Sequence, residues 1–183
     1  RVIVTEVDPR RTLQAHFDGF DVLKMTEAAK LGDLFITTTG NCSIIPGEHF
    51  PLLKDGALLA NAGHFDVEIN KKDLEAISVR VWQRKPNIMG YETKDGRVIN
   101  LLAEGRLVNL AAGNGHPAEI MDLSFAVQAL MMEHIAKLPE KLSPALYEVP
   151  PEIDTLVARE KLRSVGIKID SLTGEQEKYL KSW

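Results

Sequence analysis

The chain has 183 residues, of which 44% are hydrophobic and 26% charged, and its formal net charge is -4. This length suits one domain with a substantial core, and an acidic balance without a basic stripe argues against a nucleic-acid partner. No apolar run approaches the roughly 20 residues that cross a bilayer, so we expect neither a membrane span nor a secretory leader. The single cysteine, Cys42, excludes an intrachain disulfide. We therefore expect a cytoplasmic protein in which Cys42 is a small buried residue.

The first third of the chain alternates predicted strands with predicted helices. Short apolar and β-branched runs predict strands at residues 2–5, 21–25, 33–40 and 57–63, and the stretches between them predict helices at residues 8–17, 26–32 and 46–54. Such alternation is typical of a parallel sheet covered by helices. The expected fold class is therefore α/β, with a Rossmann-like parallel sheet.

The rest of the chain has a different pattern. Residues 79–102 alternate as antiparallel strands do, with a hairpin turn at residues 94–96. Residues 117–137 predict a long helix with too many apolar residues for one stripe, so we expect it to be buried on several sides. Four prolines then mark a linker, which is followed by a predicted helix at residues 153–165, a short strand at 167–169 and a helical turn after residue 173.

Glu6 ends the first predicted strand, in the run VTEVDP at residues 4–9. In dinucleotide-binding folds an acidic residue at the end of the second strand accepts the hydroxyls of the adenosine ribose. The alternative is a carboxylate that caps the next helix, but Asp8 already fits that role. A ribose-binding Glu6 implies a preceding strand and a Gly-rich loop about 20 residues earlier. We expect both to be missing from this chain.

Two other predicted strand ends carry small and polar residues, in TTTGN at residues 37–41 and NAGH at residues 61–64. In an open parallel sheet ligands lie outside the carboxyl ends of the strands, so both turns should face one crevice. Small residues let a cofactor approach the backbone, and Thr and Asn supply hydrogen bonds. Because these residues are also common turn formers, turns without any ligand are an equal alternative at this point.

Three further segments decide between these alternatives: GHFDVEI at residues 63–69, LLAEGRLVNL at 101–110 and GHP at 115–117. Together they resemble the S-adenosylhomocysteine hydrolases, and the opening run and the TTTGN turn fall in the right order at the right spacing. A ten-residue motif is far more specific than a lone GxGxxG. The resemblance extends over the whole chain and implies NAD as the cofactor, with no metal.

The resemblance implies a role for each matching position. Glu6 would bind the adenosine ribose of NAD, and the other cofactor-binding residues would be Thr37, Thr38, Thr39, Asn41, Ala62, Gly63, His64, Asn109 and His116. The substrate-binding residues would be Leu110, His116, Met121 and Phe125. His64 would also be catalytic, whereas His16, His49 and His134 are interpreted as surface or packing residues.

The implied reaction is the reversible hydrolysis of S-adenosyl-L-homocysteine to adenosine and L-homocysteine. In the family, NAD oxidises the ribose 3′-hydroxyl, which acidifies the hydrogen at C4′; homocysteine is eliminated, water adds, and the hydride returns. Such a cycle needs a neutral polar group near the 3′-oxygen, and an imidazole such as that of His64 suits this role near pH 7.

The resemblance also implies how the chain is organised. Residues 1–114 would be an NAD-binding domain that is incomplete at its N-terminus, residues 115–138 a hinge with a substrate-domain helix, and residues 139–183 a linker with a C-terminal arm. By the family pattern the catalytic lysine and aspartates precede residue 1, so we expect this segment alone to be inactive. The whole protein would be a homo-oligomer, a tetramer, that acts on a nucleoside.

Arg10 and Arg11 depart from the family pattern, which has an apolar residue and Asn there. Arginine could favour the 2′-phosphate of NADP, but the carboxylate of Glu6 would repel it, so NAD remains the expected cofactor.

Two other functions stay open. A non-catalytic, hydrolase-like regulator would keep the NAD-binding fold, and the residues upstream would distinguish it. An NAD-dependent 2-hydroxy-acid dehydrogenase would have the same sheet, but LLAEGRLVNL and the lack of an Arg and an acid-paired His in the expected places argue against it.

Overall fold

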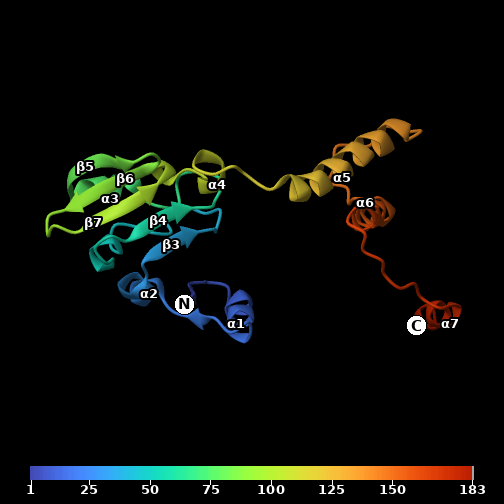
Figure 1. Cartoon of the computed structure of the whole chain (residues 1–183), viewed down its shortest axis with the longest axis horizontal. Coiled ribbons are helices and arrows are strands. Elements are labelled where there is room, and N and C mark those ends of the chain that lie inside the picture. Colours follow the sequence, from blue (N-terminus) through green and yellow to red (C-terminus); the bar gives the residue numbers. More distant parts are fainter. Residues whose placement is uncertain (183) are drawn as a thin grey trace. The chain divides into compact units, whose positions relative to one another are not determined.

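A computed structural model describes residues 1–182 and divides into two compact units, Arg1–Gly115 and the residues from His116 on (Figure 1). The strands of the first unit are β1 (Ile3–Val4), β2 (Asp21–Val22), β3 (Leu34–Thr37), β4 (Leu58–Asn61), β5 (Ser78–Lys85), β6 (Ile88–Thr93) and β7 (Val98–Leu102). Its helices are α1 (Pro9–Phe17), α2 (Met25–Leu31), α3 (Lys71–Ile77) and α4 (Val108–Ala111), with short 3-10 helices η1 (Phe50–Leu52) and η2 (Ala103–Gly105).

Five of the strands form the main sheet in the order β3-β4-β7-β6-β5. β3, β4 and β7 run parallel to one another, and β6 and β5 extend the sheet as antiparallel strands. β1 and β2 form a separate parallel pair. The predicted α/β class with a parallel sheet is confirmed, and the antiparallel stretch lies where the sequence placed it.

The core of the first unit packs against the middle of the main sheet. Its fully buried members include Ile45, Phe50, Leu59, Leu74, Ile99 and Leu101. They come from β4, β7, α3, η1 and the loop before η1, so residues far apart in the chain share one apolar cluster. This core holds β4 and β7 together with α3 and η1.

The start of α1 follows the sequence prediction. The Asp8 carboxylate accepts a hydrogen bond from the backbone N–H of Arg10 at 2.8 Å, and Pro9 occupies the first turn, where its missing N–H costs nothing. Asp8 is therefore the cap of this helix, and Glu6 is left for another role.

The helix predicted at residues 46–54 is wrong. This segment forms turns and the short 3-10 helix η1. Its backbone hydrogen bonds join residues three apart, from His49 N to Pro46 O and from Leu52 N to His49 O, whereas an α-helix needs bonds between residues four apart. The backbone N–H of Gly47 instead binds the Asp73 carboxylate, at 2.9 Å. Helix α3 was not predicted, although Asn70 caps it by accepting a hydrogen bond from Asp73 N.

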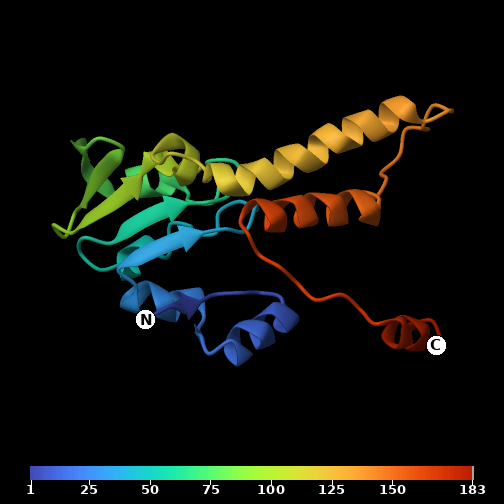
Figure 2. The same ribbon diagram turned by 45° about the vertical axis from the view of Figure 1, so that its right-hand side comes forward.

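The second unit contains α5 (Ala118–Lys137), α6 (Pro151–Ser164) and α7 (Gly174–Leu180). α5 and α6 lie side by side, as Figure 2 shows, and an ion pair of 3.1 Å joins Asp122 to Lys161. Within residues 116–182 α5 has no fully buried residue, and Phe125 and Met132 are more than half exposed, so this part of the chain does not supply the burial predicted for α5. No described helix is long and apolar enough to span a membrane.

Two smaller expectations are also wrong. Residues 167–169 form no strand, because no neighbouring strand pairs with them in the described chain and their isoleucines stay exposed. Cys42 is exposed and not buried, since it lies in the polar turn that follows β3.

Candidate functional site

A buried carboxylate organises the turn that follows β3. Glu68 is 1% exposed, and its side chain accepts hydrogen bonds from the backbone N–H and the hydroxyl of Thr39, at 3.0 and 2.9 Å, and from the backbone N–H of Gly40, at 2.7 Å. Its own carbonyl accepts from Ile44 N and Ile45 N. The turn at residues 37–41 therefore takes its shape from a residue 28 or 29 positions away.

The buried side-chain amide of Asn61 organises the turn that follows β4. The side-chain oxygen of Asn61 accepts from Thr37 Oγ1 at 3.2 Å and from Gly63 N at 2.7 Å. Its side-chain nitrogen donates to the carbonyls of Phe65 and Gly105, both at 2.8 Å. All four hydrogen-bonding positions of the amide are thus used, and the ends of β3, β4 and β7 are joined through one side chain.

Gly63 lies where these two groups meet. A Cβ atom at this position would overlap Oε1 of Glu68 and come within 3.0 Å of the Asn61 side-chain oxygen. Only a glycine lets the buried carboxylate approach the backbone of the NAGH turn so closely. This close packing explains the glycine better than turn geometry does.

The predicted site residues in these two turns differ in exposure. Thr37 is buried, with its hydroxyl bonded to Asn61. Several others are exposed at the ends of the strands, namely Thr38, Thr39, Asn41, Ala62 and His64. The His64 ring packs edge-on against Phe65, with their centroids 4.7 Å apart, and its nitrogens have no hydrogen-bond partner in residues 1–182. These turns therefore present backbone, hydroxyl and imidazole groups to an incoming ligand.

Asn109 lies in α4, the short helix that follows β7 and η2. A bridge between Asn61 and Leu107 links the end of β4 to the segment before α4. Asn109 is half-buried, its carbonyl accepts from Gly115 N at 2.9 Å, and the neighbouring Leu110 is 65% exposed. The structure thus brings Asn109 to the same end of the sheet as the turns after β3 and β4.

Glu6 lies in the loop that follows β1 of the smaller sheet. Its Oε1 accepts from the backbone N–H groups of Val7 at 2.6 Å and Asp8 at 3.0 Å. The bonds from Asp8 and Val7 hold the pKa of the exposed Glu6 carboxyl below its ordinary value. Glu6 is therefore an ionised acceptor at neutral pH, and no hydrogen bond in residues 1–182 joins it to the main sheet.

These groups fit a dinucleotide. An exposed carboxylate suits the ribose hydroxyls, and polar turns at the carboxyl ends of parallel strands suit the rest of the cofactor. The other predicted site residues, His116, Met121 and Phe125, belong to the second unit, where His116 and Phe125 are exposed and Met121 is half-buried. The described residues contain no group of His, Cys, Asp or Glu arranged to hold a metal ion.

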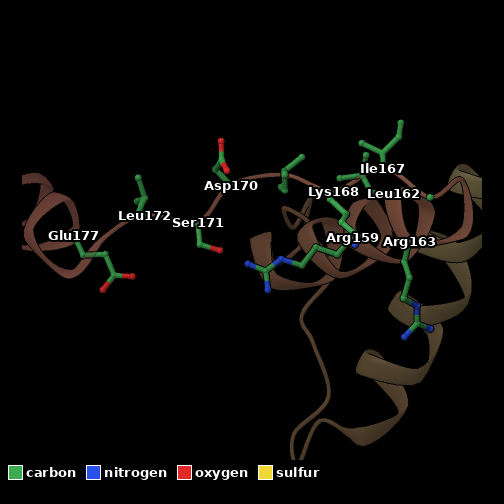
Figure 3. A pocket seen from close by; sticks show the side chains of 11 residues that line it. Arg159, Leu162, Arg163, Ile167, Lys168, Asp170, Ser171, Leu172 and Glu177 are labelled. Atoms are coloured by element: carbon green, nitrogen blue, oxygen red, sulfur yellow. The ribbon is translucent and has the colours of Figure 1, made fainter.

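An open hollow of about 660 Å³ lies in the second unit, between α6 and the segment that leads to α7. Figure 3 shows that its charged side chains, including Arg159, Arg163 and Asp170, point in different directions and do not converge. Arg163 is already paired with Glu160. We assign no ligand to this hollow.

Sequence reasoning missed the two residues at the centre of the network, Asn61 and Glu68. Asn61 begins the NAGH turn, and Glu68 lies in the GHFDVEI motif. The signal for Glu68 was a charged residue between Val67 and Ile69, a position where an apolar residue is ordinary in a buried run.

Residues 1–115 match the family described as S-adenosyl-L-homocysteine hydrolase, NAD binding domain. The chain belongs to this family. Over 182 residues it is 62% identical to an adenosylhomocysteinase of Thermococcus kodakarensis and 57% identical to one of Aquifex aeolicus. Over 183 residues it is 53% identical to an S-inosyl-L-homocysteine hydrolase of Methanopyrus kandleri. Each comparison covers the whole chain but only 43%, 44% and 43% of the relative, respectively.

The match confirms the family predicted from the sequence and indicates NAD as the cofactor of this domain. The chain spans less than half the length of these curated relatives, and their names differ in the nucleoside they specify.

Proposed function

We propose that the polypeptide carrying this chain catalyses the reversible hydrolysis of S-adenosyl-L-homocysteine to adenosine and L-homocysteine with bound NAD. The observation that carries the proposal is the buried network of Asn61 and Glu68, which ties the ends of β3, β4 and β7 together. Parallel sheets bind their ligands at this end of the strands. Family membership supplies the chemistry that such a crevice serves.

Each part of the cofactor has candidate partners in this chain. Glu6 accepts the ribose hydroxyls of the adenosine half, and its ionised carboxylate repels the 2′-phosphate of NADP. The remaining cofactor contacts are assigned to Thr37, Thr38, Thr39, Asn41, Ala62, Gly63, His64, Asn109 and His116. Of these, we place Ala62, Gly63 and His64 beside the nicotinamide and Asn109 on its carboxamide.

When bound, NAD supplies the oxidation of the ribose 3′-hydroxyl that activates the neighbouring carbon for elimination. The imidazole of His64 is exposed, and its ring nitrogens form no hydrogen bond within residues 1–182. It can therefore hold or release a proton at the 3′-oxygen. The apolar residues Leu110, Met121 and Phe125 are proposed to contact the nucleoside together with His116.

A second candidate differs in the nucleoside base. The relative from Methanopyrus kandleri is named for S-inosyl-L-homocysteine, and its 53% identity equals that of an adenosylhomocysteinase from Saccharolobus solfataricus. Hydrolysis of S-inosyl-L-homocysteine would use the same ribose chemistry. Adenine offers an amino donor where hypoxanthine offers a carbonyl acceptor, so one pocket cannot suit both equally.

One experiment separates these candidates. Free thiol released from each thioether is measured with the NAD-loaded polypeptide, and kcat/KM is compared for the adenosyl and inosyl substrates. The proposal expects a ratio of at least tenfold in favour of the adenosyl substrate. A ratio in the other direction selects the inosyl candidate, and NAD binding without thiol release from either substrate indicates a non-catalytic regulator. Reduction of NAD by 2-hydroxy acids would instead indicate a dehydrogenase.

The remaining proposals concern the whole protein. We propose that residues 1–114 belong to the NAD-binding domain, residues 115–138 form the hinge and a substrate-domain helix, and residues 139–183 form a linker and C-terminal arm. We also propose a cytoplasmic homotetramer. Light scattering coupled to size exclusion of the NAD-loaded polypeptide tests the tetramer, and a mass of one or two subunits would contradict it.

A further inference from the structure

Glu68 is a buried acid without a cationic partner. Its side chain is 1% exposed, and no Lys, Arg or His of residues 1–182 forms an ion pair with it. Burying a charge is costly unless it is paired or hydrogen-bonded. Here three donors satisfy it: two backbone N–H groups and one hydroxyl, from Thr39 and Gly40.

The donors around Glu68 suit a carboxylate. A carboxylate only accepts hydrogen bonds, whereas a protonated carboxyl would also need an acceptor for its own hydrogen. Neutral donors satisfy the oxygens without cancelling the net negative charge. The interior beneath the turns of β3 and β4 thus carries a fixed negative charge that no described side chain neutralises.

This charge lies against the turn that we assign to the nicotinamide. Gly63 carries no Cβ, and any Cβ there would overlap Oε1 of Glu68. Gly63 itself is buried, while the residues on either side of it, Ala62 and His64, are exposed. One glycine backbone therefore separates the carboxylate from the open side of the turn.

We propose that the buried carboxylate of Glu68 biases the bound cofactor towards its oxidised form. The inference rests on the proposed function, in which the nicotinamide lies beside Ala62, Gly63 and His64. The nicotinamide ring of NAD+ carries a positive charge and that of NADH is neutral, so a nearby negative charge in a low-dielectric interior stabilises NAD+ selectively. For an enzyme that must begin each cycle by oxidation of its substrate, this bias keeps the cofactor ready.

Glu68→Gln separates charge from shape, because the amide has nearly the same size but no charge. Dissociation constants for NAD+ and NADH are measured on the cofactor-free polypeptide, and the potential of the bound couple is measured by redox titration. We expect the ratio Kd(NAD+)/Kd(NADH) to rise about tenfold, which for this two-electron couple raises the potential by about 30 mV.

Two further variants make the test specific. Glu68→Asp keeps the charge but shortens the reach to the turn, so both cofactor forms should bind more weakly while their ratio stays within threefold. Asp66→Asn removes an exposed negative charge of the same segment, which is paired with Lys71 at 2.9 Å, and should leave the ratio unchanged within threefold.

The outcomes are distinct. A role in turn structure alone predicts that Glu68→Gln and Glu68→Asp weaken both forms together with no change in ratio, and that result would overturn the proposal. So would an equal shift in Asp66→Asn. If Glu68→Gln does not fold, the redox titration of the unmodified polypeptide decides, because a charge that stabilises NAD+ selectively must lower the potential of the bound couple below that of free NAD+/NADH, and a potential at or above the free value would overturn the proposal. Failure of the unmodified polypeptide to bind either form would instead overturn the proposed function, and this inference with it.

Discussion

Asn61 donates a 2.8 Å hydrogen bond to the carbonyl of Gly105, although the two residues are 44 positions apart in the chain. This bond joins the end of β4 to η2, where Ala103 and Glu104 adopt left-handed backbone conformations with φ of 49° and 57°. Non-glycine residues avoid this region unless their surroundings impose it. The polar network therefore holds a locally strained turn next to the predicted cofactor crevice.

Asn61→Ala should destabilise the protein by about 3 kcal/mol, because it leaves buried donors and acceptors of three segments without partners. Thr37→Val is the matched control. It removes a single bond to the same amide oxygen, which keeps its bond from Gly63, and should cost about 1 kcal/mol. Denaturant unfolding of both variants measures the two values. Equal losses in the two variants would contradict a central role for Asn61.

Asp95 in the β6–β7 turn predicts a pH effect on stability. Bonds from the Arg97 and Thr93 side chains hold the pKa of its exposed carboxyl well below its usual range. A carboxyl with a lowered pKa in the folded state stabilises the protein above its unfolded value of about 4, and this stabilisation is lost as the pH falls through the lower, folded value.

Asp95→Asn should therefore lower the melting temperature at pH 7, with a difference from the unmodified protein that shrinks as the pH falls below about 4. Thermal unfolding across this range measures the difference. Asp170→Asn, which removes an exposed charge elsewhere, provides the charge-matched control. A difference that stays constant down to strongly acid pH would show that Asp95 acts by its hydrogen bonds alone.

Local patterns in the sequence were sufficient for most of the fold. Short apolar runs bounded by glycines predicted β3 and β4, and the Asp8-Pro9 pair predicted the start of α1. The predicted helix at residues 46–54 was wrong because Gly47 binds Asp73, a partner 26 positions later that propensity does not include. The parallel pairing of β7 with β4 depends in the same way on contacts that are distant in the sequence.

In the candidate site too, sequence motifs predicted some residues, while others depend on contacts that are distant in the sequence. Motif resemblance singled out Thr39 and His64, which the structure shows to be exposed at the ends of β3 and β4. For Gly63 the sequence suggested the close approach of a cofactor, and it did not reveal the carboxylate of Glu68 that packs behind this residue. Buried polar networks join side chains across several turns, and sequence spacing alone does not reveal which donor meets which acceptor.

Cofactor choice tests the role of Glu6. Arg10 forms an ion pair with Asp8, with 3.0 Å between Arg10 Nη2 and Asp8 Oδ2. This pairing makes the guanidinium less available to a 2′-phosphate than the sequence suggests. The polypeptide should bind NAD at least tenfold more tightly than NADP, and Glu6→Ala should reduce that preference at least tenfold. Asp8→Asn, which keeps a capping side chain but releases Arg10, is the comparison variant. Equal or tighter binding of NADP by the unmodified polypeptide would contradict the assignment of Glu6.

His64 provides the test of chemistry at the site. Its ring is exposed and packs on Phe65, so His64→Ala should leave the melting temperature nearly unchanged. If the imidazole assists proton transfer at the 3′-oxygen, the variant should reduce bound NAD with adenosine at least tenfold more slowly, which corresponds to about 1.4 kcal/mol of barrier. Single-turnover absorbance of the bound NADH follows this step directly.

His16→Ala is the matched control for His64, because His16 is also an exposed histidine that packs on the phenylalanine that follows it, with 5.8 Å between the ring centroids. His16 lies on α1, away from the three strand ends. The His16→Ala variant should therefore reduce bound NAD at the same rate as the unmodified polypeptide. An unchanged rate in His64→Ala would leave His64 as a residue of the turn, without a part in proton transfer.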